Sequence, residues 1–313
     1  MRKAVKAGLI TLASFLLLGS LILLGVMAMP RSQYETNTPE IAEAFGGITI
    51  DTAVSAVSIV PSENGVCSVA CYEKKNATHA VSVENGVLTV RVVDERKWYE
   101  RIFDFGFRAP SVTLYLPAGE YGDLEIQSST GDVSINSAFR FESIDISEST
   151  GDVTNYASAS EDIKIKTTTG NIYLENVSAG ALELSVSTGD ITVSGASCAG
   201  DVRIAVSTGD TSLSGIACKN LISTGSTGDL SLQDVIATER FSMERSTGDV
   251  RFEACDAAEI FIETDTGNVK GSLLSEKVFI VDTDTGKKEV PKTTTGGRCE
   301  ITTDTGDIKI IIA

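Results

Sequence analysis

The stretch that decides the fold is LELSVSTGDITVSGASCAGDVRIAVSTGD, residues 182–210. It contains the tetrapeptide STGD twice, at Ser187–Asp190 and at Ser207–Asp210, and the two copies are 20 residues apart. Around each copy, apolar residues alternate with polar ones, which is the period of a β-strand with one buried face. One repeat unit therefore holds a strand, a glycine turn and a second strand.

The same Thr-Gly turn recurs ten times, and successive turn glycines are 19 or 20 residues apart. The ten glycines are Gly131, Gly151, Gly170, Gly189, Gly209, Gly228, Gly248, Gly267, Gly286 and Gly306. A repeat of nearly constant length indicates units that stack and bury a shared core. We expect each glycine to make a structural turn with positive φ. The sequence predicts an all-β fold, a single-stranded β-solenoid (β-helix) with coils of 19–20 residues.

Apolar side chains keep fixed distances from each turn glycine. Pairs lie seven and five residues before it, as Leu182 and Leu184 do, and two and four residues after it, as Ile191 and Val193 do. A third apolar column follows seven residues after it, in Val177, Ala196, Ile216, Val235 and Cys255. The alternatives fit less well, because a propeller blade needs about 40 residues and the strands of a sandwich do not share one turn sequence.

The N-terminus predicts a membrane anchor. Arg2, Lys3 and Lys6 precede an uncharged stretch, residues 7–29, whose length as a helix would span a hydrocarbon core of about 30 Å. The basic flank favours an N-terminus in the cytoplasm and a C-terminal domain outside it, in a single-pass protein of the cell membrane. The alternative is a cleaved signal peptide that ends near residues 26–28, but the apolar region of a signal peptide is usually shorter.

The chain divides into four segments on this interpretation. Residues 1–30 are the basic start and transmembrane anchor, 31–45 a linker, 46–126 degenerate solenoid coils, and 127–313 the regular coils. An aromatic insertion, residues 94–110, interrupts the degenerate coils and is expected either to cover the rod or to form a binding loop. Its aromatic residues are Trp98, Tyr99, Phe103, Phe105 and Phe107.

An acidic or amide residue follows most turn glycines. The positions are Asp132, Asp152, Asn171, Asp190, Asp210, Asp229, Asp249, Asn268, Lys287 and Asp307. Asp and Asn suit tight turns because their side chains bond to nearby backbone groups. The alternative, a ladder of calcium sites, has too few oxygens per coil, and Lys287 would repel the ion. Asp304 and Asp307 are the best calcium candidates; we predict no cofactor.

The six cysteines are expected to be buried thiols. Cys198 and Cys218 both lie nine residues after a turn glycine, so stacking on neighbouring coils would also suit a disulfide. Cys67 and Cys71 with His79 suggest a metal site, but no fourth ligand follows at a recognisable spacing.

Charge and composition narrow the classes of function. The 43 acidic residues exceed the 26 basic ones and give a net charge of −17, which disfavours nucleic acid as a partner. With a single histidine, His79, most general-base schemes are excluded, so we predict that the protein is not an enzyme. Arg203, Arg245 and Arg251 interrupt the repeat and are interpreted as solvated surface charges.

The layout resembles a bacterial membrane-anchored family of unknown function whose members are called "putative adhesins". The matching features are the basic start with its apolar span, the aromatic insertion before VTLYLPAG (Val112–Gly119), and the serial STGD turns. The later units depart from the pattern, with Asp265, Asp284 and Asp304 in place of Ser. The resemblance implies the solenoid fold and a role at the cell surface, and it implies no catalytic residues.

The resulting hypothesis is a membrane-tethered, extracytoplasmic β-solenoid that acts as an adhesin, a binding module or a structural module. Its partner would be an unknown surface glycan or protein. The alternatives are a sensory or regulatory partner in an envelope-stress system and, less favoured, a polysaccharide-active enzyme. Residues 308–313 form an apolar strand without a polar cap, so the chain itself covers that end or copies associate end to end.

Overall fold

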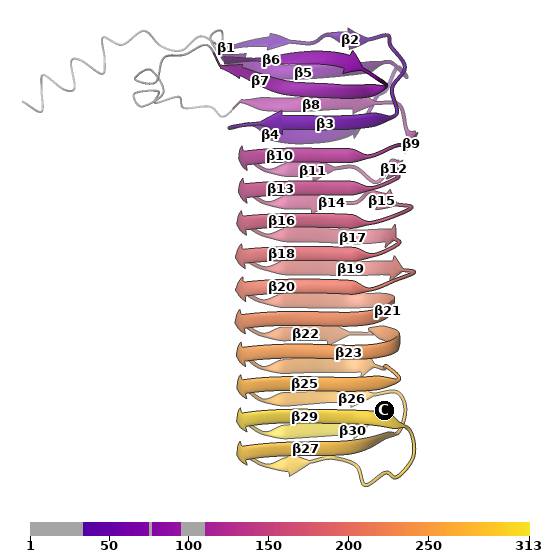
Figure 1. Cartoon of the computed structure of the whole chain (residues 1–313), viewed down its shortest axis with the longest axis vertical. Helices are drawn as coiled ribbons and strands as arrows, with labels where there is room; N and C mark the ends of the chain where they lie inside the picture. The colour runs from indigo at the N-terminus through magenta and orange to yellow at the C-terminus, as the bar shows by residue number, and fades with distance from the viewer. Residues whose placement is uncertain (1–33, 75–76, 95–109) are drawn as a thin grey trace, which may run out of the picture.

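The computed structural model of the chain describes residues 34–74, 77–94 and 110–313. These residues form strands β1 to β30 and no helix. Figure 1 shows an elongated rod in which the strands lie across the long axis and stack along it. Within this described part, no helix has the length and hydropathy needed to cross a membrane. The predicted anchor, residues 7–29, lies outside the described residues.

Each regular rung has a front strand, a glycine corner and a back strand. The front strands are β10 (Leu124–Thr130), β13 (Ile144–Thr150), β16 (Ile163–Thr169), β18 (Leu182–Thr188), β20 (Val202–Thr208) and β25 (Glu259–Thr266). The back strands are β11 (Val133–Ile135), β14 (Val153–Asn155), β17 (Ile172–Ala179), β19 (Ile191–Cys198), β22 (Leu230–Gln233), β24 (Val250–Cys255) and β26 (Val269–Leu273).

A third side completes the coil. In the early rungs it holds a separate three-stranded sheet of β9 (Gly119–Tyr121), β12 (Phe139–Phe141) and β15 (Ser158–Ala159). In the later rungs, β21 (Thr211–Thr227) and β23 (Ile236–Thr247) each continue without a break from this side into the front strand of the next rung. The third apolar column lies here and is buried, as in Val177 and Val235.

Neighbouring rungs pair in parallel and in register. Ile163 lies beside Leu182, and Leu182 beside Val202, so residues at one place in the repeat form a column along the rod. Inward columns are almost fully buried, while the residues between them face solvent, because strand side chains alternate between faces. The predicted β-solenoid is confirmed.

The glycine corners stack directly on one another. Gly170 has a φ of 137°, and a Cβ atom there would lie 2.0 Å from the carbonyl oxygen of Gly151. The same close approach recurs between Gly189 and Gly170. Only glycine fits, because any side chain would collide with the backbone of the rung below.

The residues after the glycines form a continuous hydrogen-bonded ladder. In each rung, the Asp or Asn Oδ1 accepts the backbone N–H of the equivalent residue in the next rung. The donor–acceptor distances are 2.7–3.0 Å, as for Asp210 N to Asp190 Oδ1 at 2.7 Å and Asp229 N to Asp210 Oδ1 at 2.8 Å. The ladder gives a physical reason for Asp and Asn at this position, because both carry the required acceptor.

The last two rungs are interleaved. Strand β29 (Gly297–Thr305) pairs with both β25 and β27 (Lys277–Thr285), and β30 (Ile308–Ile312) pairs with β26 and β28 (Lys288–Glu289). The final coil of the chain, β29–β30, is therefore inserted between the β25–β26 rung and the β27–β28 coil that precedes it in sequence, and β27 lies at the edge (Figure 1). The chain itself covers part of the apolar C-terminal strand, because β28 pairs with its first two residues, Ile308 and Lys309. End-to-end association of copies stays a prediction.

The N-terminal end is interleaved as well. Strands β3 (Gly47–Thr52) and β4 (Ala56–Pro61) lie between the β10–β11 rung and the rung of β7 (Val87–Asp94) and β8 (Ser111–Leu116). Beyond that rung, β5 (Cys67–Lys74) runs antiparallel to β8, and β6 (Ala77–Glu84) runs antiparallel to β7. The short strands β1 (Tyr34–Asn37) and β2 (Glu40–Ile41) pair antiparallel with β5. This antiparallel layer, which the repeat pattern did not predict, caps the rod.

Candidate functional site

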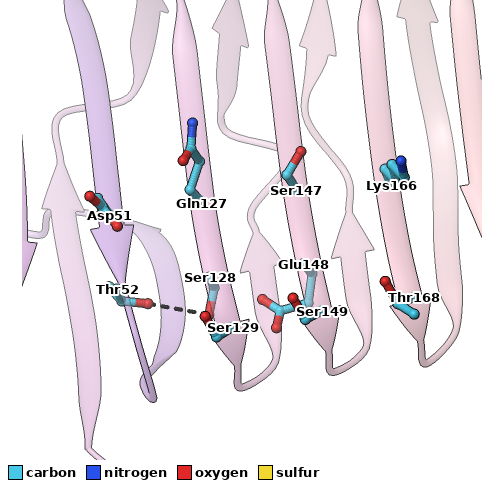
Figure 2. Close-up of a pocket in the computed structure, with 10 residues that line it drawn as sticks. All are labelled: Asp51, Thr52, Gln127, Ser128, Ser129, Ser147, Glu148, Ser149, Lys166 and Thr168. Carbon is cyan, nitrogen blue, oxygen red and sulfur yellow. Dashed lines mark hydrogen bonds between the residues drawn. The ribbon is translucent and has the colours of Figure 1, made fainter.

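A polar hollow of about 350 Å³ lies on the front face, where β3, β10, β13 and β16 approach their corners (Figure 2). Four adjacent rungs build it, so its lining repeats at the spacing of parallel strands, about 4.8 Å. Ten residues line it: Asp51, Thr52, Gln127, Ser128, Ser129, Ser147, Glu148, Ser149, Lys166 and Thr168. We call this hollow the front groove.

An outward row of four different polar side chains crosses the front groove. Asp51, Gln127, Ser147 and Lys166 occupy one column, because the strands that carry them pair in register. The row offers a carboxylate, an amide, a hydroxyl and an ammonium group in that order (Figure 2). Together they can both donate and accept hydrogen bonds along the rod axis.

An inward row lies beside it, in the column three residues before each corner glycine. Its members here are Thr52, Ser128, Glu148 and Thr167. The Thr52 hydroxyl donates to Ser128 Oγ at 3.2 Å, and the Thr150 backbone N–H donates to Glu148 Oε1 at 3.1 Å. Glu148 Oε2 is buried and has no hydrogen-bond partner, although the Glu148 side chain lines the front groove.

The electrostatics of Glu148 follow from this position. Glu148 is only 5% exposed, and burial raises the pKa of its carboxyl group. Hydrogen bonds from the Ser128 hydroxyl and from the backbone of Thr150 and Ser149 oppose the rise in pKa, while Asp132 adds to it. A buried carboxylate oxygen without a donor costs free energy, which a ligand that supplies a donor would recover.

The front groove is suited to a ligand that is rich in hydroxyl or amino groups. Glu148 Oε2 can accept one hydrogen bond more than the protein supplies, and the outward row offers donors and acceptors around it. An extended polymer could follow the same column over several rungs, because the rungs repeat. This site was not predicted from the sequence.

The acidic calcium candidates have structural partners in the ladder. Asp307 Oδ1 accepts the Lys287 backbone N–H at 2.9 Å, and the Asp307 N–H donates to Asn268 Oδ1 at 3.0 Å. Asp304 is exposed beside them. Lys287, which breaks the Asp column, belongs to the edge rung, where no further rung needs its side chain as an acceptor.

The cysteines of the chain are all buried free thiols in this structure. Burial raises the pKa of Cys198 to about 11 and that of Cys218 to about 12, so both are protonated at neutral pH. Cys71 lies close to His79, as the sequence suggested, and Glu73 joins them. Cys67 is on the same face of β5, four residues earlier, and is not part of this group.

Arg245 corrects one expectation. It is 2% exposed, not a solvated surface charge, and it lies in the same inward column as Glu148. Its Nη2 atom donates to Ser223 Oγ at 3.0 Å and to Thr211 Oγ1 at 3.3 Å. Gly225 in the adjacent rung provides the space, since a Cβ there would lie 2.6 Å from Arg245 Nη1. Burial lowers the Arg245 pKa to about 10, which leaves it charged at neutral pH.

The aromatic insertion predicted at residues 94–110 lies outside the described residues except for its two end residues, Asp94 and Pro110. Its members Trp98, Tyr99, Phe103, Phe105 and Phe107 therefore remain predictions. The described strands β7 and β8 end and begin on either side of it, next to the antiparallel cap.

The stacked rungs and glycine corners place the protein in the class of β-solenoid proteins. A family model matches the sequence of the chain. The model described as "Toastrack DUF4097" matches residues 45–205 and 199–313. The chain belongs to this family. No functionally curated protein has significant similarity to it.

Solved structures resemble the chain at low sequence identity. A "putative adhesin" from Parabacteroides distasonis is 12% identical, with a TM-score of 0.50, over 90% of this chain and 98% of that chain. A "putative adhesin" from Parabacteroides merdae is 13% identical, with a TM-score of 0.49, over 76% of this chain and 96% of that chain. A "putative lipid binding protein" from P. distasonis is 16% identical, with a TM-score of 0.47, over 76% and 94% of the two chains. At these identities the likeness concerns the fold alone.

Proposed function

We propose that the protein is a membrane-tethered, extracytoplasmic β-solenoid that binds a hydroxyl-rich surface glycan through the front groove. One observation carries the proposal: Glu148 lines a polar hollow, and its buried Oε2 atom has no hydrogen-bond partner within the protein. Sugar hydroxyl and amino groups supply such donors, and polysaccharide chains are long enough to contact several rungs. The uncharged stretch of residues 7–29 would hold the rod at the membrane.

The rod itself supports a role in display. Its rungs form one continuous buried core from β3 to β30, which makes the molecule stiff along its axis. A stiff rod presents the groove at a fixed distance from its N-terminal end. The proposal assigns the protein no catalytic reaction, so incubation with cell-wall polysaccharides should release no soluble product.

Binding to cell-wall material tests the glycan proposal. The purified full chain in detergent is mixed with insoluble cell wall and with a glycan array, and bound protein is quantified. Glu148→Gln and Lys166→Ala should each weaken binding about tenfold, because the first replaces the free acceptor Oε2 with an amide donor and the second removes a donor, each worth about 1.4 kcal/mol. Glu263→Gln is the matched control, since Glu263 is exposed on the front face of a distant rung. Equal binding by all four proteins would contradict the proposal.

A second candidate function is a protein partner at the edge rung. Strand β27 pairs with β29, and Val278 and Ile280 on it are 38% and 48% exposed. Exposed apolar residues on an edge strand favour strand addition by another chain. The occupant would be a regulatory membrane protein or a second copy of this chain. Ile280→Lys should abolish such an association, measured by cross-linking and light scattering, without any effect on glycan binding.

A further inference from the structure

A cluster of side chains that can bind a metal ion lies inside the antiparallel cap. It shares no residue with the front groove. Cys71 and Glu73 are two residues apart on the inward face of β5, and His79 is on β6. Their ligand atoms, one thiol sulfur, one carboxylate oxygen and one ring nitrogen, lie within 4.8 Å of one another. All three side chains are buried, with exposed fractions of 1%, 1% and 7%.

The cluster is already ordered by hydrogen bonds. Glu73 Oε2 lies 2.9 Å from His79 Nδ1 and accepts the His79 backbone N–H at 2.6 Å. The other ring nitrogen, Nε2, lies 3.3 Å from the hydroxyl of Ser55, a residue of the corner between β3 and β4. The imidazole ring is therefore held from both sides, with Nδ1 directed at the carboxylate.

Charge balance favours a divalent cation here. Glu73 is a buried carboxylate, and within the described part of the chain His79 is the basic side chain that pairs with it. Isolated buried charge is costly. A zinc ion bound by one thiolate, one carboxylate and one neutral imidazole gives a site with no net charge, which burial does not penalise.

The donor set and its surroundings suit zinc. Zinc binds sulfur, nitrogen and carboxylate oxygen, and sites with three protein ligands leave a fourth position for water. Ligating histidines commonly donate their second ring N–H to a nearby acceptor, and the Ser55 hydroxyl is in place for that role. Ser55 is 2% exposed, so the Ser55–His79–Glu73 row is closed to a polymeric substrate and fits metal binding better than hydrolysis.

We propose that Cys71, Glu73 and His79 form a zinc site that fastens β5 to β6 and the cap to the first corner of the rod. Binding replaces the thiol proton of Cys71, which leaves to solvent. The neutral imidazole of His79 carries its proton on Nε2, facing the Ser55 hydroxyl, instead of on Nδ1, and the ion takes the place of the Nδ1 proton as the partner of Glu73. The site stabilises the end of the rod where the predicted membrane anchor joins it.

The test uses the purified full chain, stripped with a chelator and then titrated with zinc and, separately, with cobalt(II). We expect one equivalent of either metal to bind, a rise in Tm of about 5 °C with zinc, and a sulfur-to-cobalt charge-transfer band. Cys71→Ser should remove the charge-transfer band, and Glu73→Gln or His79→Gln should weaken zinc binding at least tenfold.

Cys67→Ser is the matched control, because Cys67 is buried on the same face of the same strand and lies outside the cluster. It should keep the band and the zinc-dependent Tm. Circular dichroism checks that each variant is folded; if Cys71→Ser does not fold, the nearly isosteric Glu73→Gln decides. Failure of the folded wild type to bind one equivalent of zinc, or an unchanged band in Cys71→Ser, would overturn the proposal.

Discussion

At the scale of the residue, two kinds of polar side chain have opposite consequences for stability. The corner Asp and Asn residues each satisfy a backbone N–H of the next rung, so their carboxylates and amides are part of the backbone hydrogen-bond network. Glu148 instead brings a carboxylate into the interior with one oxygen unpaired. The corner column therefore contributes to the fold, while Glu148 costs stability and keeps an unused hydrogen-bond acceptor beside the front groove.

We expect Asp210→Ala to lower the free energy of unfolding by about 1 kcal/mol, because the Asp229 N–H loses its acceptor. Asp210→Asn should be nearly neutral, since Asn171 and Asn268 perform the same role in other rungs. Lys287→Ala, at the edge rung, provides the control and should also be neutral. Urea denaturation followed by circular dichroism measures all three; a large loss for Asp210→Asn would argue against the ladder.

Glu148→Gln is expected to stabilise the protein at neutral pH. The pKa of Glu148 is raised in the folded state, so the native protein loses stability as pH rises from the unfolded pKa through the folded one. Glutamine cannot ionise, so it removes the cost of burying the carboxylate charge, which is at least about 1 kcal/mol. The difference in Tm between variant and wild type should be positive at pH 8 and should vanish near pH 3. A constant difference across this range would show that ionisation is not the cause.

At the scale of the element, the ends of the rod differ from its middle. In the middle, sequence order and spatial order agree, from β10 to β25. At the C-terminal end β29 separates β25 from β27, so β27 has strand pairing only with the last coil, and an ion pair of Lys277 Nζ with Asp256 Oδ1 at 2.6 Å links it to the rod directly. The edge rung therefore depends on the final coil for its strand pairing.

Truncation after Gly296 tests this dependence. Without β29 and β30, β27 loses the strand with which it pairs, and we expect its amides to exchange with deuterium as fast as those of an unfolded segment. Amides of β16 and β18 should keep their protection, because their partners are unaffected. Hydrogen exchange with mass spectrometry resolves both regions; protected β27 amides in the truncated protein would show that β27 can pair with β25 directly.

The sequence contained enough information for the rungs but not for their order at the ends. Period and alternation predict the corners and the buried columns, because each depends on neighbours within one unit. The units of β27 and β29 have equivalent sequences, and the repeat does not specify which of them pairs with β25. Lys287, in place of Asp, was the local sign that the β27–β28 unit lies at the edge of the rod. Glu148 and Arg245 had a signal as well, because both are charged residues in an inward column. The antiparallel pairing of β5 and β6 has no trace in the repeat.

At the scale of the whole molecule, the proposed orientation places the entire rod outside the cytoplasm. The native thiols are buried, and burial raises their pKa values, to about 11 for Cys198 and about 12 for Cys299, so they react poorly with maleimides. The wild-type chain should therefore give little labelling with maleimides, so an introduced cysteine can be detected against it.

A cysteine at an exposed position should report the side of the membrane. Glu183→Cys, at a side chain that is 56% exposed, is expected to react with a membrane-impermeant maleimide in intact protoplasts. Ala4→Cys, ahead of the predicted anchor, should react only after lysis. Labelling of Glu183→Cys only after lysis would contradict the extracytoplasmic rod, and a mature protein that lacks the Ala4→Cys label altogether would indicate a cleaved signal peptide.

The interleaved ends also restrict how such a protein can change size during evolution. A duplicated unit added at either end would disturb the inserted β29–β30 coil or the antiparallel cap. A unit added between β13 and β23 would pair with equivalent strands on both sides. Each such duplication inserts 19–20 residues and lifts the far extremity by about 4.8 Å. Homologues with rods of different length should therefore differ in the number of central rungs and keep the same structure at both ends.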